Sequence, residues 1–340
     1  MSASRQIEII GGGLAGLSLG LALRRANIEV TLIEAGSYPR HRVCGEFITG
    51  LSAGTRARLG LDAFLTDAAS NREVAWFIRG VPVRYQRLPA VAPGLSRFTL
   101  DARLADAFVA AGGTLRTNQR WSDSSDSPGR VFATGRRRSP SRWLGLKMHV
   151  LDLSLNRDLE LHLGDQAYIG LTRIERNRVN VCGLFHRREL GVKGADILLA
   201  YLRASRLESL ADRLEAAAPD PTSFSAVAAV EFDQRVEPAA EVRLGDMLAM
   251  IPPFTGHGMA MAFQSAEIAL NPLIAFARGE APWPQTRHVI HTALRRRFRL
   301  RLASAGALHS FLLKPSRQRW LGALNRARLI PLGPLYAALH

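Results

Sequence analysis

Two short segments hold the residues whose types and spacing could do chemistry. In the first, Gly11, Gly13 and Gly16 form a Gly-x-Gly-x-x-Gly pattern between two apolar runs, and Glu34 ends the second run. The first glycine of such a pattern permits a tight turn, the second lets a pyrophosphate approach the backbone, and the third lets a helix pack closely against a strand. A carboxylate after the next strand accepts hydrogen bonds from ribose hydroxyls. The segment therefore predicts a dinucleotide site.

The predicted helix begins immediately after Gly13. Leu14 and Ala15 stand in its first turn, so their N–H groups and the positive end of the helix dipole would face the phosphates. An acid at Glu34 disfavours a ligand that carries a 2′-phosphate on its ribose.

The second segment is HRVCGEF, residues 41–47. Cys44 has a small, polarisable thiol that can pack against an apolar ligand, and it could take part in proton transfer to carbon if its thiolate form is accessible. Glu46 could orient Arg42 or a hydroxyl group of a substrate. Whether Cys44 reacts or only packs stays open at this point.

The parts of the chain that must position these segments show two different patterns of apolar residues. Residues 6–34 read as strand, glycine turn, helix and strand, and helical spacing returns at residues 100–111 and 258–278. Residues 145–185 instead hold strand-length segments with alternating or continuous apolar character, which is typical of an antiparallel sheet. We therefore predict an α/β protein in which a Rossmann-like domain is interleaved with an antiparallel β-sheet domain, followed by a helical C-terminal tail.

The expected domain boundaries follow from these two sequence patterns. The predicted segments are 1–78, 97–145 and 235–280 for the nucleotide-binding domain, 79–96 and 146–234 for the substrate domain, and 281–340 for a basic helical tail. The tail is expected to contain two or three helices, with breaks at Pro315 and Pro331.

The composition excludes several classes of protein. Of the 340 residues, 47% are hydrophobic and 22% are charged, which is the balance of a globular chain and not of a disordered one. Two cysteines cannot build a disulfide framework, so a reducing, cytoplasmic setting is expected. The apolar run at residues 9–23 is too short and too rich in glycine to span a membrane.

Positive charge is concentrated at the C-terminal end of the chain. The formal net charge is +16, and no acidic residue follows Glu280. Such a tail is either a solvated helical face or a surface for an anionic membrane or an acidic carrier protein. Nucleic acid is not predicted as a partner, because no recognisable binding motif is present. A cytoplasmic protein is expected, with a position peripheral to a membrane as the alternative.

A family resemblance appears near residue 250. Gly245-Asp246, followed by IPPFTGHGMAMAFQSAEIAL, resembles the GD…P…GxG segment of FAD-dependent oxidoreductases in the geranylgeranyl reductase and aromatic hydroxylase (class A flavin monooxygenase) superfamily. The resemblance implies that Asp246 binds the ribityl chain of FAD and that the next helix begins at the flavin ring. The implied roles in the turn are cofactor binding for Pro253, Gly256 and Gly258, and contact with flavin or substrate for His257.

Two further segments agree with this resemblance. RFTLD, residues 97–101, is similar to the R-x-x-hydrophobic-D start of a family helix, which implies that Arg97 lies near FAD. We expect Asp101 to be the N-cap of that helix. PRHRVCG, residues 39–45, resembles the P-x-x-[KR]-x-C-G stretch of geranylgeranyl reductases, which implies that Arg42 contacts the cofactor and that Cys44 lies beside the flavin.

The resemblance implies an FAD enzyme, with NAD(P)H as a transient reductant. Aromatic hydroxylases carry an Asp-Gly pair where this chain reads ATGRR, residues 133–137, so reduction of carbon–carbon double bonds is slightly favoured. The alternative is a monooxygenase that hydroxylates or epoxidises its substrate with NAD(P)H and O₂. A non-catalytic flavin-binding protein at a membrane surface is the third reading, and the missing WxWxIP motif argues against a halogenase.

The substrate is expected to be a small apolar or aromatic molecule. The inward side chains of the sheet at residues 147–185 are predicted to be Leu, Ile, Val and Tyr168, which suits such a ligand. His149, His162 and His186 lack metal-ligand spacing and are expected to be structural or on the surface. No metal site is predicted.

Overall fold

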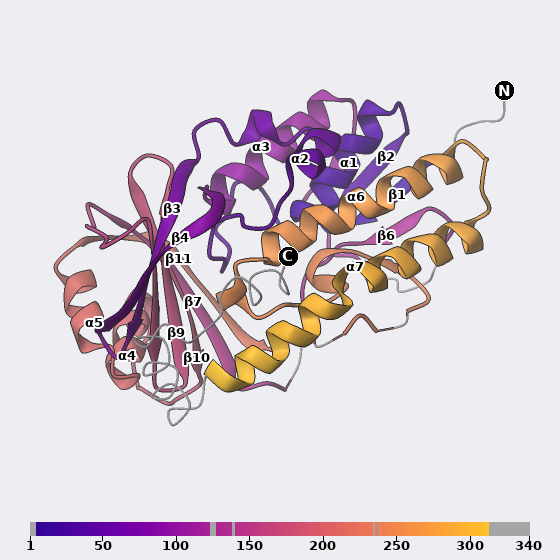
Figure 1. Ribbon diagram of the computed structural model, residues 1–340. Helices are drawn as coiled ribbons and strands as arrows, with labels where there is room; N and C mark the ends of the chain where they lie inside the picture. The colour runs from indigo at the N-terminus through magenta and orange to yellow at the C-terminus, as the bar shows by residue number, and fades with distance from the viewer. Residues whose placement is uncertain (1–4, 123–126, 138–139, 234, 238, 313–340) are drawn as a thin grey trace.

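The computed structural model describes residues 5–122, 127–137, 140–233, 235–237 and 239–312. Its two β-sheets form two lobes. Figure 1 shows the smaller sheet flanked by helices α1, α2 and α3, the larger sheet fanning out on the other side, and two long helices, α6 and α7, that run beside the smaller sheet.

The smaller sheet has five strands in the order β12-β6-β1-β2-β5, and all of its pairs are parallel. Its strands are β1 (Ile7–Ile10), β2 (Val30–Ile33), β5 (Thr114–Arg116), β6 (Arg130–Phe132) and β12 (Val242–Arg243). Short apolar runs such as IEII and VTLI suit a parallel sheet that is covered on both faces. Strand β12 follows every strand of the larger sheet along the chain, so the smaller lobe is discontinuous in sequence.

Helix α1 (Leu14–Arg25) begins directly at the glycine turn, and its residues from Leu14 to Leu23 are all buried. A Cβ atom on Gly16 would lie 2.0 Å from the carbonyl oxygen of Gly11. Only a residue without a side chain permits this approach, so Gly16 has the packing role that the sequence predicts.

The larger sheet has seven strands in the order β11-β7-β10-β9-β8-β3-β4. Its strands are β3 (Ala69–Ile78), β4 (Val81–Gly94), β7 (Trp143–Leu151), β8 (Leu159–Gly164), β9 (Ala167–Ile174), β10 (Arg178–His186) and β11 (Ala218–Val230). All neighbours are antiparallel except β3 and β8. Helices α4 (Ile197–Ala204) and α5 (Glu208–Glu215) bury their apolar faces against one side of it. The predicted fold class, α/β with a second antiparallel sheet, is confirmed.

Two expected segment boundaries differ from the observed sheets. The boundary at residue 78 assigns β3 to the nucleotide-binding domain, whereas β3 pairs with β4 and β8 in the larger sheet. The larger sheet also takes up residues 143–145 at the start of β7. Apolar and polar residues alternate only partly in β3 and β7. The sequence pattern therefore did not assign these residues to the antiparallel sheet.

Helix α3 (Arg97–Ala110) has a different N-cap from the one predicted. The side chain of Ser96 accepts a hydrogen bond from the Thr99 N–H and caps the helix. Asp101 lies inside the helix and is fully buried. Glu175, which follows β9, accepts hydrogen bonds from the Ser96 N–H at 2.8 Å and from the Thr99 hydroxyl at 2.8 Å, and so fastens this helix to the larger sheet.

Two long helices complete the chain that the structure describes. Helix α6 (Gly258–Ala277) is long and apolar enough to cross a membrane by length and composition, but 61% of that apolar window is buried, mainly against α1. Helix α7 (Trp283–Leu312) is a single helix of 30 residues, and it corresponds to the first helix expected between residue 286 and the break at Pro315. Pro315 and Pro331 lie outside the described residues. Ile290, Leu294 and Phe298 are fully buried, so this part of the expected tail belongs to the main core.

Candidate active-site cavity

A cavity of about 860 Å³ opens between the two lobes. It is lined by the turn before α1, by residues 40–47, by the start of α3, by residues 119–121 and 133–136, and by the segment around Asp246. The predicted site residues on its wall are Gly11, Gly13, Leu14, Ala15, Glu34, Arg42, Cys44, Glu46, Arg97, Asp246, Pro253, Gly256 and Gly258. Gly16 and His257 are the predicted residues that do not line it.

Two glycines on the wall are not required by the packing of the protein. A Cβ atom on Gly13 would meet no atom closer than 3.9 Å, and one on Gly258 would meet none within 4 Å. Both residues stand where helices begin, α1 after Gly13 and α6 at Gly258. A missing side chain at a helix start leaves backbone N–H groups open to an anion. These two helix starts, at Gly13 and Gly258, are called the glycine cradle below. The glycine cradle fits the pyrophosphate and flavin ring of a bound FAD.

Glu34 follows the end of β2 and lies on the cavity wall beside the glycine turn. Its carboxylate accepts hydrogen bonds from the Gly12 N–H at 2.6 Å and the Gly36 N–H at 3.0 Å, and from Arg40 at 2.6 Å. Burial opposes ionisation, but Arg40 and the backbone donors outweigh it and lower the pKa of Glu34. Glu34 is therefore an ionised acceptor, as ribose hydroxyls require.

A buried carboxylate fixes two arginines on the cavity wall. Asp101 accepts from Arg97 Nε at 2.7 Å, from Arg97 Nη2 at 2.8 Å and from Arg42 Nε at 3.0 Å. Burial works against the charge of Arg97, but Asp101 raises its pKa. Burial and the neighbouring Arg97 lower the pKa of Arg42. Two guanidinium groups share one carboxylate, so this side of the cavity suits an anionic ligand.

Asp246 projects into the cavity next to these cations. Its side chain is exposed to the cavity, while the surrounding protein still withdraws it from bulk water and raises its pKa, with Arg97 opposing this effect. Gly245 stands before it at a φ of 57°, and its N–H donates to Ser265 Oγ at 3.0 Å. The turn thus presents a carboxylate on the cavity wall.

Cys44 is on the wall with its thiol largely enclosed. Burial raises its pKa, so the neutral thiol is the form present near pH 7. The side-chain amide of Asn180 donates to the Cys44 carbonyl at 2.9 Å and holds the loop against the larger sheet. Cys182 also lines the cavity, in keeping with its expected place in the core or on the cavity wall, and burial raises its pKa as well. The arrangement favours packing over thiolate chemistry for Cys44.

Glu46 has different partners from those predicted. Its carboxylate is fully buried and contacts Lys147, His149 and the N–H of Arg97, and it makes no contact with Arg42. Arg42 pairs with Asp101 instead. His149 was expected to be structural or on the surface, and it is buried next to a cavity residue.

His257 is the N-cap residue of α6 and is buried. Its Nδ1 lies 2.6 Å from the carbonyl oxygen of Thr255 within the same turn. The predicted contact with flavin or substrate is therefore not supported by its position. Tyr168 also differs from expectation, because it packs edge to face on Phe254 at 5.9 Å and does not line the cavity.

Sequence reasoning missed several cavity residues. These are Arg40, His41, Arg120, Trp121, Thr134 and Arg136. The basic run PRHR was the available signal for the first two.

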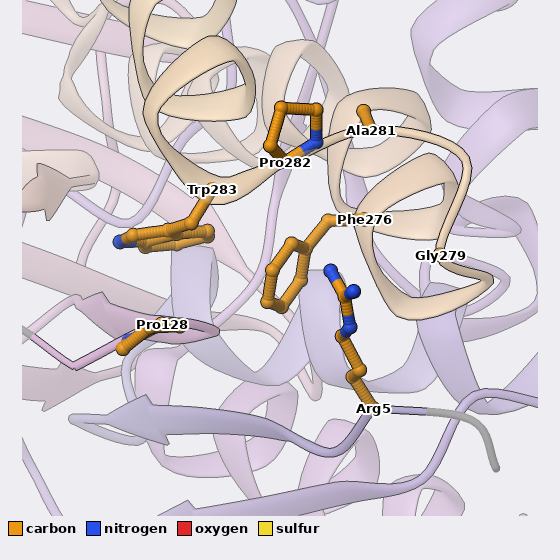
Figure 2. Close-up of a pocket in the computed structure, with 7 residues that line it drawn as sticks. All are labelled: Arg5, Pro128, Phe276, Gly279, Ala281, Pro282 and Trp283. Carbon is orange, nitrogen blue, oxygen red and sulfur yellow. The ribbon is translucent and has the colours of Figure 1, made fainter. Parts of the chain in front are cut away.

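A second hollow, of about 420 Å³, lies at the turn between α6 and α7, where Figure 2 shows Phe276, Trp283 and Arg5 around it. It holds none of the predicted residues and no acid.

Two histidines with lowered pKa values, the partly buried His41 and the buried His309, predict how stability depends on pH. Burial lowers the pKa of His41 and of His309 to about 4, from an ordinary value of 6.5, and Lys147 adds to the effect at His41. The folded state thus holds both rings neutral, while the unfolded chain takes up protons first as the pH falls. Their contribution is complete above pH 6.5 and is lost as the pH falls towards 4. Urea titrations at several pH values should show this decline, and a flat profile between pH 6.5 and 4 would contradict it.

No group of three or more His, Cys, Asp or Glu side chains that could hold a metal ion occurs within the described ranges.

Comparison with known proteins gives matches to Rossmann domains and to flavin enzymes. The family described as "NAD(P)-binding Rossmann-like domain" matches residues 9–76. Menaquinone reductase from Mycolicibacterium smegmatis is 25% identical over 138 residues, which is 39% of this chain and 34% of that protein. The match therefore spans about a third of the length of that relative.

Solved structures match over nearly the whole chain. The p-nitrophenol 4-monooxygenase PnpA from Pseudomonas putida has a TM-score of 0.76 at 15% identity, covering 100% of this chain and 97% of that one. HpxO from Klebsiella pneumoniae, in complex with FAD and uric acid, has a TM-score of 0.75 at 15% identity, covering 98% and 96%. These likenesses confirm, at the level of the fold, the predicted resemblance to FAD-dependent oxidoreductases.

Proposed function

We propose that the protein is an FAD-dependent monooxygenase that uses NAD(P)H and O₂ to oxidise a small aromatic or apolar molecule. The observation that carries this proposal is the single cavity that joins the glycine cradle to the wall of the larger sheet. The solved structures with the same fold support it, because one is a monooxygenase and another holds FAD with uric acid, a small heterocycle.

Some residues on the cavity wall would contact FAD, and others would contact the substrate. Glu34 would hold the ribose, the α1 N-terminus with Arg42 the pyrophosphate, and Asp246 the ribityl chain. Bound there, FAD would supply hydride acceptance and the activation of oxygen. Apolar residues such as Val227, Val230 and Ile251 line the remaining space, which suits an apolar or aromatic substrate.

Reduction of carbon–carbon double bonds, which the sequence slightly favours, is the second candidate. The partial match to a menaquinone reductase supports it, as does the P-x-x-R-x-C-G stretch that carries Cys44. The whole-chain likeness to a monooxygenase favours oxygenation over reduction.

The two candidates differ in their need for oxygen. Purified protein loaded with FAD would be given NADH or NADPH with a panel of phenols, aromatic acids and a prenylated quinone, in air and under nitrogen. Oxygenation predicts that an aromatic compound stimulates O₂ and NAD(P)H consumption in equal amounts, and that turnover stops under nitrogen. Saturation of a double bond in the prenyl chain of the quinone under nitrogen would establish the reductase instead, and a protein unable to bind FAD would exclude both.

The exposed side of α7 supports the proposal that the protein docks on an anionic lipid surface. Arg295, Arg296 and Arg299 are exposed, and Leu300 has 67% of its surface exposed among them. Basic side chains around an apolar one suit the interface of an anionic membrane. A peripheral position at the cytoplasmic side of a membrane, rather than free cytoplasm, follows from this proposal.

Sedimentation with vesicles tests this surface. We expect the protein to sediment with phosphatidylglycerol vesicles and not with phosphatidylcholine vesicles. Arg295→Glu/Arg299→Glu should weaken binding roughly 30-fold, because each basic residue near such a surface contributes about 1 kcal/mol. Arg72→Glu/Arg206→Glu changes the same number of exposed arginines on the other lobe and should bind as the wild type does. Equal binding of both variants would exclude α7 as the docking surface.

A further inference from the structure

A buried cluster of ionisable groups lies behind one wall of the cavity. Glu46 and Lys147 have no exposed surface, and Glu46 Oε1 lies 3.4 Å from Lys147 Nζ. The other carboxylate oxygen, Oε2, lies 2.6 Å from Nε2 of His149, which is also fully buried. Lys147 and His149 are two residues apart on β7 and so share one face of the sheet.

His41 extends this cluster to the cavity loop. Its Nδ1 lies 3.1 Å from Lys147 Nζ, and its ring stacks on Phe98 with centroids 4.5 Å apart. Both His41 and Glu46 line the cavity, whereas Lys147 and His149 do not. The contacts therefore form a continuous chain from His41 through Lys147 to Glu46 and His149.

Packing alone does not account for such a cluster. Taking a lysine and a carboxylate out of water costs more than apolar side chains of the same size would. Glu46 moreover has a φ of 58°, a strained backbone conformation for a residue with a side chain. Buried ionisable groups joined by hydrogen bonds next to a cavity are typical of acid–base sites.

We propose that Lys147 and His41 form a proton relay that delivers to the cavity the proton consumed in each turnover, with Glu46 and His149 as positioning residues. The inference rests on the proposed function, but both candidate reactions need this proton. Oxygenation converts substrate, NAD(P)H, O₂ and one proton into hydroxylated substrate, NAD(P)⁺ and water. Reduction of a double bond uses NAD(P)H and one proton to give the saturated product and NAD(P)⁺.

The proton moves in two transfers through the His41 ring. Lys147 Nζ gives a proton to His41 Nδ1 while His41 Nε2 gives its own proton to the ligand in the cavity, and solvent returns the proton along the same path after the product leaves. Glu46, which has no exposed surface, holds the Lys147 ammonium between turnovers. Burial lowers the pKa of Lys147, which favours the first transfer. Burial, Lys147 and His149 lower the pKa of His41 to about 4, against Glu46 and Asp220, so its Nδ1 is an acceptor for Lys147 at rest.

The test follows the reoxidation of the reduced holoprotein by O₂, a reaction that needs no organic substrate. Reduced FAD in its anionic form, O₂ and one proton give oxidised FAD and hydrogen peroxide. FAD-loaded protein is reduced with dithionite and mixed with O₂ in H₂O and in D₂O over a range of pH. The variant is Glu46→Gln/Lys147→Met, in which both buried charges are removed together so that neither is left unpaired. The control is His162→Asn, because His162 also pairs with a buried glutamate, Glu160 at 2.8 Å, but neither lines the cavity.

The relay predicts that the double variant binds FAD, reoxidises about 100-fold more slowly, which is the lower range for general acid catalysis, and loses the pH dependence of the wild type. The control should match the wild type in rate, pH profile and solvent isotope effect. Reoxidation of the double variant at the wild-type rate and with the wild-type isotope effect would overturn the relay.

A second measurement is independent of FAD and of any substrate. Histidine ring signals in NMR give the pKa of His41, which Lys147→Met should raise because it removes the neighbouring positive charge. His162→Asn should leave this pKa unchanged. An unchanged value in Lys147→Met would overturn the relay, while a failed screen of aromatic substrates would overturn only the proposed oxygenation.

Discussion

Lys147→Met is expected to lower the free energy of unfolding by about 3–5 kcal/mol, the usual cost of leaving one buried charge without its partner. The change removes the ammonium group and leaves the fully buried Glu46 carboxylate with His149 and one backbone N–H. Urea denaturation at pH 7.5 measures the difference.

An exposed ion pair provides the control for this prediction. Arg203 pairs with Glu215 at 2.6 Å, with 40% and 62% of the two side chains exposed, so Arg203→Met should cost less than about 1 kcal/mol. Glu46→Gln/Lys147→Met should recover much of the stability that Lys147→Met loses. If Lys147→Met and Arg203→Met lower the free energy of unfolding equally, the buried pair contributes no more to stability than the exposed pair does.

Gly13→Ala is expected to weaken FAD binding about 100-fold, which corresponds to about 2.7 kcal/mol, with little effect on folding. The new methyl group would lie in open cavity space, 3.9 Å from the nearest protein atom. It would occupy the position that the pyrophosphate needs, while the N-cap of α1 is only mildly perturbed. Flavin fluorescence titration gives the dissociation constant, and thermal unfolding of the apoprotein gives the stability.

Gly11→Ala is the matched contrast within the same turn. Gly11 has a φ of 109°, and a Cβ atom there would lie 2.3 Å from the carbonyl oxygen of Ala133. We expect this variant to lose stability first and to lose FAD binding as a consequence. If Gly13→Ala binds FAD as tightly as the wild type does, the proposed role of the glycine cradle in FAD binding is wrong.

The parts of the site that the sequence predicted are those encoded by local spacing. The glycine pattern and Glu34 belong to one strand–helix–strand unit, and the Gly245-Asp246 turn lies in the short segment that precedes the start of α6 at Gly258. In such units the order of residues dictates which of them meet, so their places on the cavity wall could be expected before the structure was known.

The parts that the sequence did not predict depend on contacts between distant segments. Glu46 meets Lys147 and His149 only because β7 passes behind the loop at residues 41–47, and no periodicity encodes that crossing. One signal was available: the chain has three lysines among its 45 basic residues, and Lys147 stands in the middle of an apolar strand. The N-cap of α3 was misassigned because Ser96 and Asp101 are both good capping residues, and the choice depends on Glu175 from the other lobe.

Helix α7 contributes side chains to the interiors of both lobes. Phe298 and Leu302 are buried in the core of the smaller lobe, and Leu308 packs with Trp143 and Tyr168 of the larger sheet. Figure 1 shows this helix running from one lobe to the edge of the other. A hinge motion that separated the lobes would have to expose both interiors at once. Ligands are therefore expected to enter and leave the cavity without separation of the two lobes, a motion that takes microseconds to milliseconds.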